Sequence, residues 1–375
     1  MERKKLFKSL LLVLALLVAV AMIAGCTKTA DDSSTAGDAT EQTDTADTAD
    51  TTATGGEEAA DSGSGGVTKI GISLDNLDDP YWVGLKMGLD QALEEIGSDK
   101  VQADVQVCQG DANLQAKQIQ DMLAAGANAI VCVYVDNEAI KQSIKLCNEK
   151  GVPFVYADRP VDSSDDAKVA WGMNTDDYEL SKQGWEWMVD YAKKNNIEKL
   201  NVLELVGSLT DANVLKRTNG FEDVMKANPD LIERVQSVPT EWNIEKAASG
   251  VTNALQANPE INCIFMHSDV LLAPTIQSLE TADRWKKTGE DGHVIVMPYS
   301  GNSTSLDSVK DGYVEMCFGM NTIKIGHDAV MAAYEIANGD TSTYSTPVAD
   351  PGFLITTDNF DETSKMAYGF SGMKK

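Results

Sequence analysis

Residues 69–96 read KIGISLDNLDDPYWVGLKMGLDQALEEI, and this stretch decides the fold. Residues 70–74 form a short apolar run that is typical of a buried strand. Pro80 then stands where a helix can begin, because the first helical position needs no amide donor. From Trp82 to Ile96 apolar residues recur at helical spacing, which predicts one buried helical face. The stretch is therefore a strand followed by a helix, with a polar loop between them.

The same alternation continues to residue 157. Strands are predicted at 101–108, 129–133 and 154–157, and helices at about 113–125 and 138–149. Repeated strand–helix–strand units form parallel sheets that are covered by helices on both faces. This part of the chain therefore predicts one α/β lobe.

The pattern starts again at residue 200 and predicts a second lobe of the same build. Its predicted strands are 200–206, a segment near Val235, 263–266, 293–297 and 314–318. Its predicted helices run to about residue 228, through 244–255, to Leu279 and over 325–336. The expected fold class is α/β, with two doubly wound parallel-sheet lobes. Ligands of such sheets gather at the carboxyl ends of the strands.

The first 25 residues are predicted to be an export signal. A basic start is followed by 10–24, an apolar run of 15 residues, which is shorter than the roughly 20 residues of a membrane-spanning helix. The run ends in Ile23-Ala24-Gly25-Cys26, which resembles the lipobox of bacterial lipoproteins. We therefore expect 1–25 to be a lipoprotein signal peptide, Cys26 to be lipidated, and the protein to be exported and anchored by lipid to the outer face of the cytoplasmic membrane. An ordinary signal peptide that contains a cysteine is the alternative.

Residues 26–66 are predicted to be a disordered acidic tether. Positions 27–66 hold ten Thr, eight Ala and seven Asp, but no Leu, Ile, Val, Met or aromatic residue. A segment of this composition has no apolar surface to bury. It would join the lipid to the folded part of the chain.

Charge and cysteine usage exclude several classes of function. The net charge is −27, and such a surface repels nucleic acid phosphates, so we expect no nucleic acid partner. Cys108, Cys132, Cys147, Cys263 and Cys317 form no metal-binding spacing, and we expect buried, inert thiols. The chain has three histidines and no GxSxG, HExxH or phosphate-loop motif, so we expect no catalytic residue, metal or cofactor.

Two loops of the first lobe carry candidate ligand-binding residues. The first predicted strand is followed by Asp79, Tyr81 and Trp82. Aromatic rings pack against the C–H face of a sugar, and carboxylates accept its hydroxyl protons. Asp158 and Arg159 directly follow the strand 154–157, and together they offer acceptors and a planar donor. The alternatives are that the aromatic rings belong to the core and that the Asp–Arg pair is a surface ion pair.

Loops of the second lobe hold further candidates. Asn213 and Arg217 follow the strand 200–206, and Trp242 precedes a predicted helix. Ser268 and Asp269 follow the strand 263–266. An exposed helical arginine and a packed tryptophan are the alternatives for Arg217 and Trp242.

These residues carry a resemblance to a known family. From about Lys69 to Thr356 the chain resembles the ribose-binding type of periplasmic binding protein, the type I sugar-binding family. Its motifs are Asp79-Pro80-Tyr81-Trp82, Asp158-Arg159, Arg217 before Gly220-Phe221, and Asp269 after Phe265. The resemblance implies that the family's sugar-contacting roles fall on the matching positions. The expected ligand-binding residues are Asp79, Tyr81, Trp82, Tyr134, Asp158, Arg159, Asn213, Arg217, Trp242, Ser268, Asp269, Ser300 and Asn321.

Two positions depart from the family pattern. The family usually has Asp where this chain has Ser300, and Gln or Asn at Met320 or Asn321. The resemblance also implies a three-stranded hinge, with crossings near Met173, Met320 and 347–351. It would divide the chain into an N-terminal lobe, 67–173 plus 321–348, and a C-terminal lobe, 174–320 plus 349–375.

The expected function is that of an extracytoplasmic solute-binding protein of an ABC importer. It would act as a monomer, close its lobes on a monosaccharide and present it to a membrane permease. Because the cleft would hold two arginines, a sugar acid remains an alternative ligand. A ligand-binding sensory subunit for a sugar or a quorum signal, which feeds a membrane kinase or a chemoreceptor, is the second candidate function. The export signal argues against a cytoplasmic transcription regulator.

Overall fold

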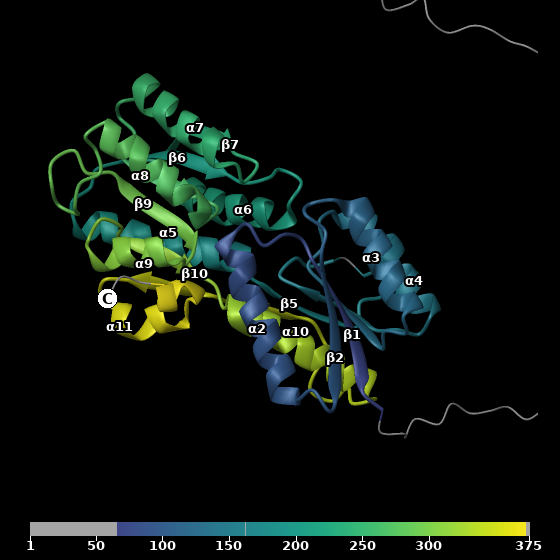
Figure 1. Ribbon diagram of the computed structural model, residues 1–375. Helices are drawn as coiled ribbons and strands as arrows, with labels where there is room; N and C mark the ends of the chain where they lie inside the picture. The colour runs from purple at the N-terminus through teal and green to yellow at the C-terminus, as the bar shows by residue number, and fades with distance from the viewer. Residues whose placement is uncertain (1–65, 162, 373–375) are drawn as a thin grey trace, which may run out of the picture. The chain divides into compact units, whose positions relative to one another are not determined.

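The computed structural model describes residues 66–161 and 163–372, which form two six-stranded sheets with helices on both faces (Figure 1). The predicted signal peptide, Cys26 and all but the last residue of the predicted tether lie outside the described residues. No helix within the two described ranges is long and apolar enough to cross a membrane.

The N-terminal sheet is parallel throughout. Its strand order is β11-β5-β4-β3-β1-β2, which places β1 between β2 and β3. This is the doubly wound order with a switch point beside the first strand. The strands are β1 (Thr68–Leu74), β2 (Val101–Val107), β3 (Ala129–Cys132), β4 (Phe154–Ala157), β5 (Trp171–Thr175) and β11 (Val348–Asp350).

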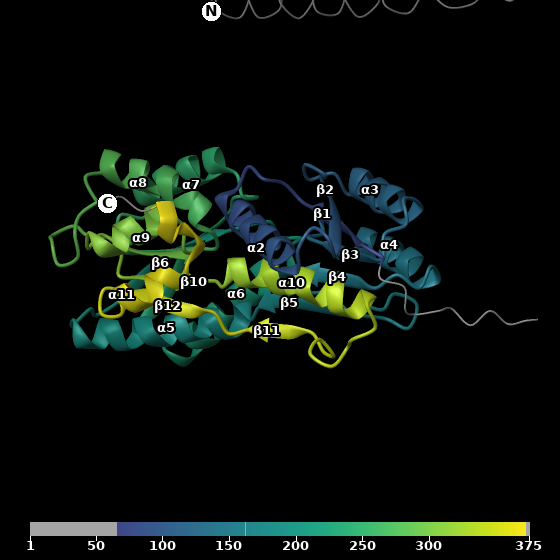
Figure 2. The same cartoon turned by 60° about the horizontal axis from the view of Figure 1, so that its bottom comes forward.

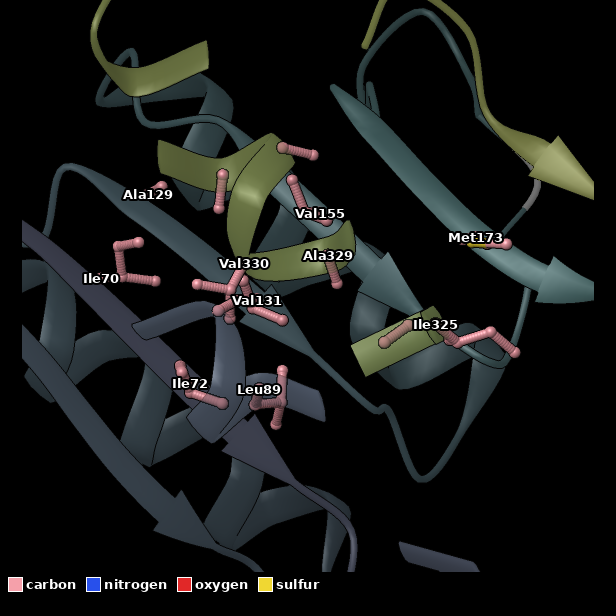
Figure 3. Close-up of a cluster of buried hydrophobic side chains, with 14 of the residues drawn as sticks. Ile70, Ile72, Leu89, Ala129, Val131, Val155, Met173, Ile325, Ala329 and Val330 are labelled. Atoms are coloured by element: carbon pink, nitrogen blue, oxygen red, sulfur yellow. The ribbon is translucent and has the colours of Figure 1, made fainter. Parts of the chain in front are cut away.

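Two pairs of helices cover the N-terminal sheet. Helices α2 (Pro80–Ile96) and α10 (Thr322–Ala337) pack on one face, and Figure 1 and Figure 2 both show them side by side. Helices α3 (Ala112–Ala124) and α4 (Asn137–Glu149) pack on the other face. Val131 of β3 joins the core beneath α2 and α10, which Figure 3 shows, while its neighbour Cys132 joins the core beneath α3 and α4. Because alternate side chains enter different cores, both faces of the strand must be apolar.

The C-terminal sheet repeats this arrangement with one antiparallel edge. Its strand order is β12-β10-β9-β8-β6-β7, and β12 runs antiparallel to β10. Its strands are β6 (Leu200–Val206), β7 (Ile232–Pro239), β8 (Cys263–Met266), β9 (Ile295–Ser300), β10 (Met316–Gly319) and β12 (Phe353–Thr356). Its helices are α5 (Asp177–Lys194) and α6 (Ala212–Ala227) on one face, and α7 (Ile244–Ala257), α8 (Leu272–Thr281) and α9 (Ser303–Lys310) on the other.

The predicted fold class of two doubly wound α/β lobes is confirmed. Six further strands and α-helices were not predicted as such, namely β5, α5, α9, β11, β12 and the short helix α11 (Phe360–Thr363). The strands among them lie where the chain passes from one sheet to the other or at the sheet edges, where short strands give little apolar pattern.

Asp350 ties together the segments that cross between the sheets. Its carboxylate accepts hydrogen bonds from Asn321 Nδ2 at 2.7 Å and from the Gly352 amide at 2.9 Å. Its backbone carbonyl accepts from the Asp176 amide at 2.7 Å. One residue therefore links all three crossings.

The five cysteines of the described ranges are buried free thiols, as expected. Burial raises the pKa of Cys108 to about 11 and that of Cys147 to about 12, because the thiolate would lose its hydration. These side chains therefore act as small apolar core residues.

Helices α2 and α10 approach closely at two glycines. A Cβ atom at Gly88 would lie 1.9 Å from the backbone oxygen of Ile323, and one at Gly326 would lie 2.1 Å from that of Leu85. Since both neighbours are backbone atoms, no rotamer change can relieve the clash. The absence of a side chain at both positions therefore sets the distance between the helices.

Gly88→Ala should lower the free energy of unfolding by about 1–3 kcal/mol, because the helices must move apart and lose core packing. Urea denaturation of this variant and of Glu94→Ala, an exposed position on the same helix, measures the difference. The control should stay within about 0.5 kcal/mol of the parent. Equal stability of Gly88→Ala and the parent would show that the helix contact is not constrained as described.

Candidate functional site

One cavity lies where the carboxyl ends of the two sheets face each other. Its volume is about 330 Å³, at the lower end of the roughly 300–1,000 Å³ of small-molecule sites. Its wall combines polar side chains with two tryptophan rings. The lining residues are Asp75, Asn76, Asp78, Asp79, Tyr81, Trp82, Asp158, Arg159, Asp211, Asn213, Arg217, Trp242, Ser268, Val270 and Ser300.

Asp158 and Tyr81 form a buried pair on the N-terminal wall. Tyr81 Oη donates a hydrogen bond to Asp158 Oδ1. Burial raises the pKa of Asp158 to about 7, and the nearby Arg159 guanidinium only partly offsets that rise. Asp158 is therefore a carboxyl group whose charge changes near neutral pH.

Asp79 begins helix α2 beside this pair. Its Oδ1 accepts a hydrogen bond from the Tyr81 amide at 2.9 Å, which is the usual N-cap contact. Burial raises the pKa of Asp79 as well. The cap therefore fixes the direction of both Tyr81 and the carboxylate at the mouth of the helix.

Arg159 joins the two walls of the cavity. Its Nη1 donates to Asp75 Oδ2 at 2.9 Å and to the Tyr134 carbonyl, both in the N-terminal lobe. Its Nε lies 3.5 Å from Asp211 Oδ2, on the N-cap of α6 in the C-terminal lobe. The guanidinium also lies 4.9 Å from the centre of the Trp82 ring. Both of its carboxylate partners thus come from the ends of strands in different sheets.

Arg217 occupies the C-terminal wall in a similar environment. Its Nε donates to Asp177 Oδ1 at 2.7 Å, its Nη1 donates to the His267 carbonyl, and its guanidinium lies 4.3 Å from the centre of the Tyr299 ring. The side chain is almost fully buried, since only 7% of it is exposed. A guanidinium this deep must be paired, because an unpaired buried charge is strongly destabilising.

Three lining residues have backbone conformations that residues other than glycine rarely adopt. Asp158, Trp242 and Ser300 have φ angles of 74°, 60° and 106°. A positive φ costs free energy in residues other than glycine. Gly207 makes room for the Trp242 ring, because a Cβ atom there would lie 2.0 Å from the indole. Strain at functional sites is common, and here it directs an aromatic ring and two polar groups toward the cavity.

Ten of the thirteen expected ligand-binding residues line the cavity, and Tyr134, Asp269 and Asn321 do not. Tyr134 Oη donates to the Pro160 carbonyl at 2.9 Å. Asp269 accepts from the Tyr368 hydroxyl at 3.2 Å and from the Asn302 amide. The Asn321 side chain donates to Asp350. Each of the three follows a strand, and its side chain forms hydrogen bonds with other protein groups.

Several lining residues were not among the expected set. They are Asp75, Asn76, Asp78, Asp211 and Val270. The loop that holds Asp79 also holds Asp75, Asn76 and Asp78. Its position after β1 could therefore have identified them as lining residues from the sequence. Asp177, the partner of Arg217, lies in the first turn of α5, a helix that the sequence pattern did not predict.

His267 belongs to a buried group of polar side chains in the C-terminal lobe. Its Nε2 lies 3.1 Å from Glu204 Oε1, and both side chains are fully buried. Glu204 also pairs with Arg234 at 3.0 Å. The adjacent His267, Ser268 and Asp269 therefore do not form a relay with one another.

Comparison with known proteins identifies the family. Residues 70–341 match the family described as periplasmic binding protein domain. The ribose import binding protein of Bacillus subtilis is 24% identical over 270 residues, which cover 72% of this chain and 82% of the relative. The D-allose-binding periplasmic protein of Escherichia coli is 25% identical over 262 residues, which cover 68% and 80%.

A solved structure shares the fold. It is an ABC transporter solute-binding protein from Bacillus halodurans with bound myo-inositol, which aligns with a TM-score of 0.72 at 20% identity over 81% of this chain and 99% of that one. The family comprises binding proteins, not enzymes, which agrees with the expected absence of catalysis. This chain belongs to the periplasmic binding protein family.

Proposed function

We propose that this chain binds a monosaccharide or a related polyol in the cavity and delivers it to the permease of an ABC importer. The observation that carries the proposal is the convergence of aromatic rings and hydrogen-bonding groups from both sheets on one cavity. Tyr81, Trp82 and Trp242 offer apolar faces to a sugar ring, and Asp158 and Asn213 offer acceptors to its hydroxyls.

Contacts from two lobes favour a closed arrangement of the protein. Asp158 belongs to the N-terminal sheet and Trp242 to the C-terminal one, so a ligand that touches both gains all its contacts only when the lobes are together. The expected lobes are 67–173 plus 321–348 and 174–320 plus 349–375. Two of their boundaries fall inside strands of the N-terminal sheet, since β5 ends at Thr175 and β11 at Asp350. Asp350 and the two other crossings would serve as the hinge.

The names of relatives support the ligand class. The matched proteins of Bacillus subtilis and Escherichia coli are named for ribose and D-allose, and the solved neighbour contains myo-inositol. All three compounds are small, neutral and rich in hydroxyl groups. We carry the class of small, hydroxyl-rich carbohydrates, and not one of its members, to this chain.

Export, anchoring and oligomeric state complete the proposal. A periplasmic binding protein works outside the cytoplasm, and a lipid on Cys26 would keep it beside the permease while 26–66 served as a tether. The protein would act as a monomer, because one chain supplies both walls of the cavity. Radiolabelled palmitate incorporation that is lost in Cys26→Ala tests the anchor.

A panel of pentoses, hexoses, inositols and sugar acids tests the ligand class directly. A ligand present at 100 times its Kd should stabilise the protein by about 2.7 kcal/mol, which a melting-temperature shift detects. Within this panel, a neutral pentose, hexose or inositol should produce the shift. If no member shifts the melting temperature, the proposed function loses its support.

Trp242→Leu should weaken binding of that ligand roughly tenfold, because a flat aromatic face is replaced by a smaller aliphatic one. Calorimetry on this variant measures the change in Kd. Trp285→Leu is the matched control, since Trp285 stacks on Tyr313 away from the cavity. Equal weakening in both variants would indicate a general loss of stability instead of a lost contact.

Binding should depend on pH through Asp158. Its pKa is raised to about 7 by burial, and a ligand hydroxyl donates best to the ionised carboxylate. Affinity should therefore be highest above neutral pH and fall roughly tenfold between pH 8 and pH 6, as the carboxylate takes up a proton that the ligand must displace. Asp158→Asn keeps an acceptor for Tyr81 and should bind with the same affinity at both pH values. A pH dependence that survives in this variant would assign it to another group.

A further inference from the structure

The lining of the cavity is strongly acidic. Five aspartates face two arginines among the lining residues. A neutral sugar needs hydrogen-bond donors and acceptors in comparable numbers but no net charge. The excess of carboxylates therefore bears on which carbohydrate the cavity selects.

Both arginines are already neutralised by the protein. Arg159 contacts Asp75 and Asp211, and Arg217 contacts Asp177, which lies behind the lining. Each guanidinium also lies over an aromatic ring. A guanidinium has five N–H donors, so a ligand carboxylate could bond to one of these arginines without breaking its pairs, but it would add a negative charge to a lining that already holds five aspartates. The excess of carboxylates over arginines in the lining therefore disfavours an acidic ligand relative to a neutral one.

Within the described ranges, Asp79 and Asp158 form no ion pair of their own, although the Arg159 guanidinium is close enough to offset part of the rise that burial causes in the pKa of both. Asp79 accepts from the Tyr81 amide and Asp158 from the Tyr81 hydroxyl, and both of these donors are neutral. Among the described residues no ion pair is recorded for either carboxylate. Burial raises the pKa of both carboxyl groups, because it removes water from the charged forms.

Asn213 adds an unused acceptor to the same cavity. Its side-chain oxygen is buried and has no hydrogen-bond partner among the described residues, while the residue itself is only 3% exposed. Buried polar atoms are normally satisfied. An acceptor that lines a cavity and lacks a partner is available to a donor on the ligand.

These observations point to a ligand that brings both positive charge and several donors. A protonated amine has three donors and no acceptor, and its hydrogen bonds to carboxylates are charge-assisted. We propose that the cavity prefers an amino sugar, a carbohydrate that carries a protonated amine, over its neutral parent and over the corresponding sugar acid. The inference rests on the proposed function, since it names the charge class of the ligand in the same cavity.

Matched sets of ligands test this preference. Calorimetry would compare D-glucosamine, D-glucose and D-glucuronate, and the corresponding galactose and mannose sets, at pH 7.5. In at least one set the amino sugar should bind roughly tenfold or more tightly than its neutral parent, and the acid should bind weakest. A neutral parent that binds as tightly as its amino sugar in every set that shows binding would overturn the inference and leave the proposed function standing. Absence of binding by all members would overturn both.

A charge-removing variant tests the assigned residue. Asp79→Asn keeps the helix cap, because Asn caps as well as Asp, but it removes the negative charge. It should weaken binding of both ligands, but binding of the amino sugar should fall roughly tenfold more than binding of the neutral parent. Asp190→Asn, on the exposed side of α5, makes the same change in net charge and should alter neither. If Asp79→Asn leaves the ratio of the two affinities unchanged, the charge of Asp79 does not select the ligand.

Discussion

The arrangement of the cavity depends on how one buried guanidinium is neutralised. Arg159 follows β4 directly and is largely shielded from water, so its charge requires partners within the protein. It obtains them from Asp75 after β1, from the Tyr134 carbonyl after β3, and from Asp211 in the C-terminal lobe. A single side chain thereby fixes the relative positions of three strand ends and one helix start. The other lining groups extend from strand ends and a helix start whose positions this arginine helps to fix.

Much of the fold could be predicted because parallel strands buried on both faces carry a dense apolar pattern. Residues 129–133 illustrate this, since adjacent residues enter different cores. Helix α5 was not predicted, although its buried face includes Leu180, Trp185 and Met188. Strand β11 is three residues long and mostly exposed, so it leaves no periodic signal at all.

The candidate site was predictable to the level of the loop but not of the side-chain direction. Asp79, Asp158 and Arg217 could be named because they stand at strand ends or at the start of a following helix. Tyr134 and Asp269 stand in equivalent places, yet their side chains turn to protein partners. Backbone conformation decides this direction, and the positive φ angles of Asp158 and Ser300 have no signature in residue type. A glycine would have indicated a positive φ angle in the sequence, but it could not have supplied the polar side chain.

The buried thiols have a consequence for how the protein is made. The described residues contain no covalent cross-link between cysteines, so this part of the chain can reach its final state without an oxidising enzyme. With their protons firmly held, the sulfur atoms are poor nucleophiles and exchange slowly with disulfides in the surroundings. Such a chain can fold equally well in anoxic and in aerated medium. Oxidation of these thiols by peroxides would require transient opening of a core, which makes their chemical durability depend on the stability of each lobe.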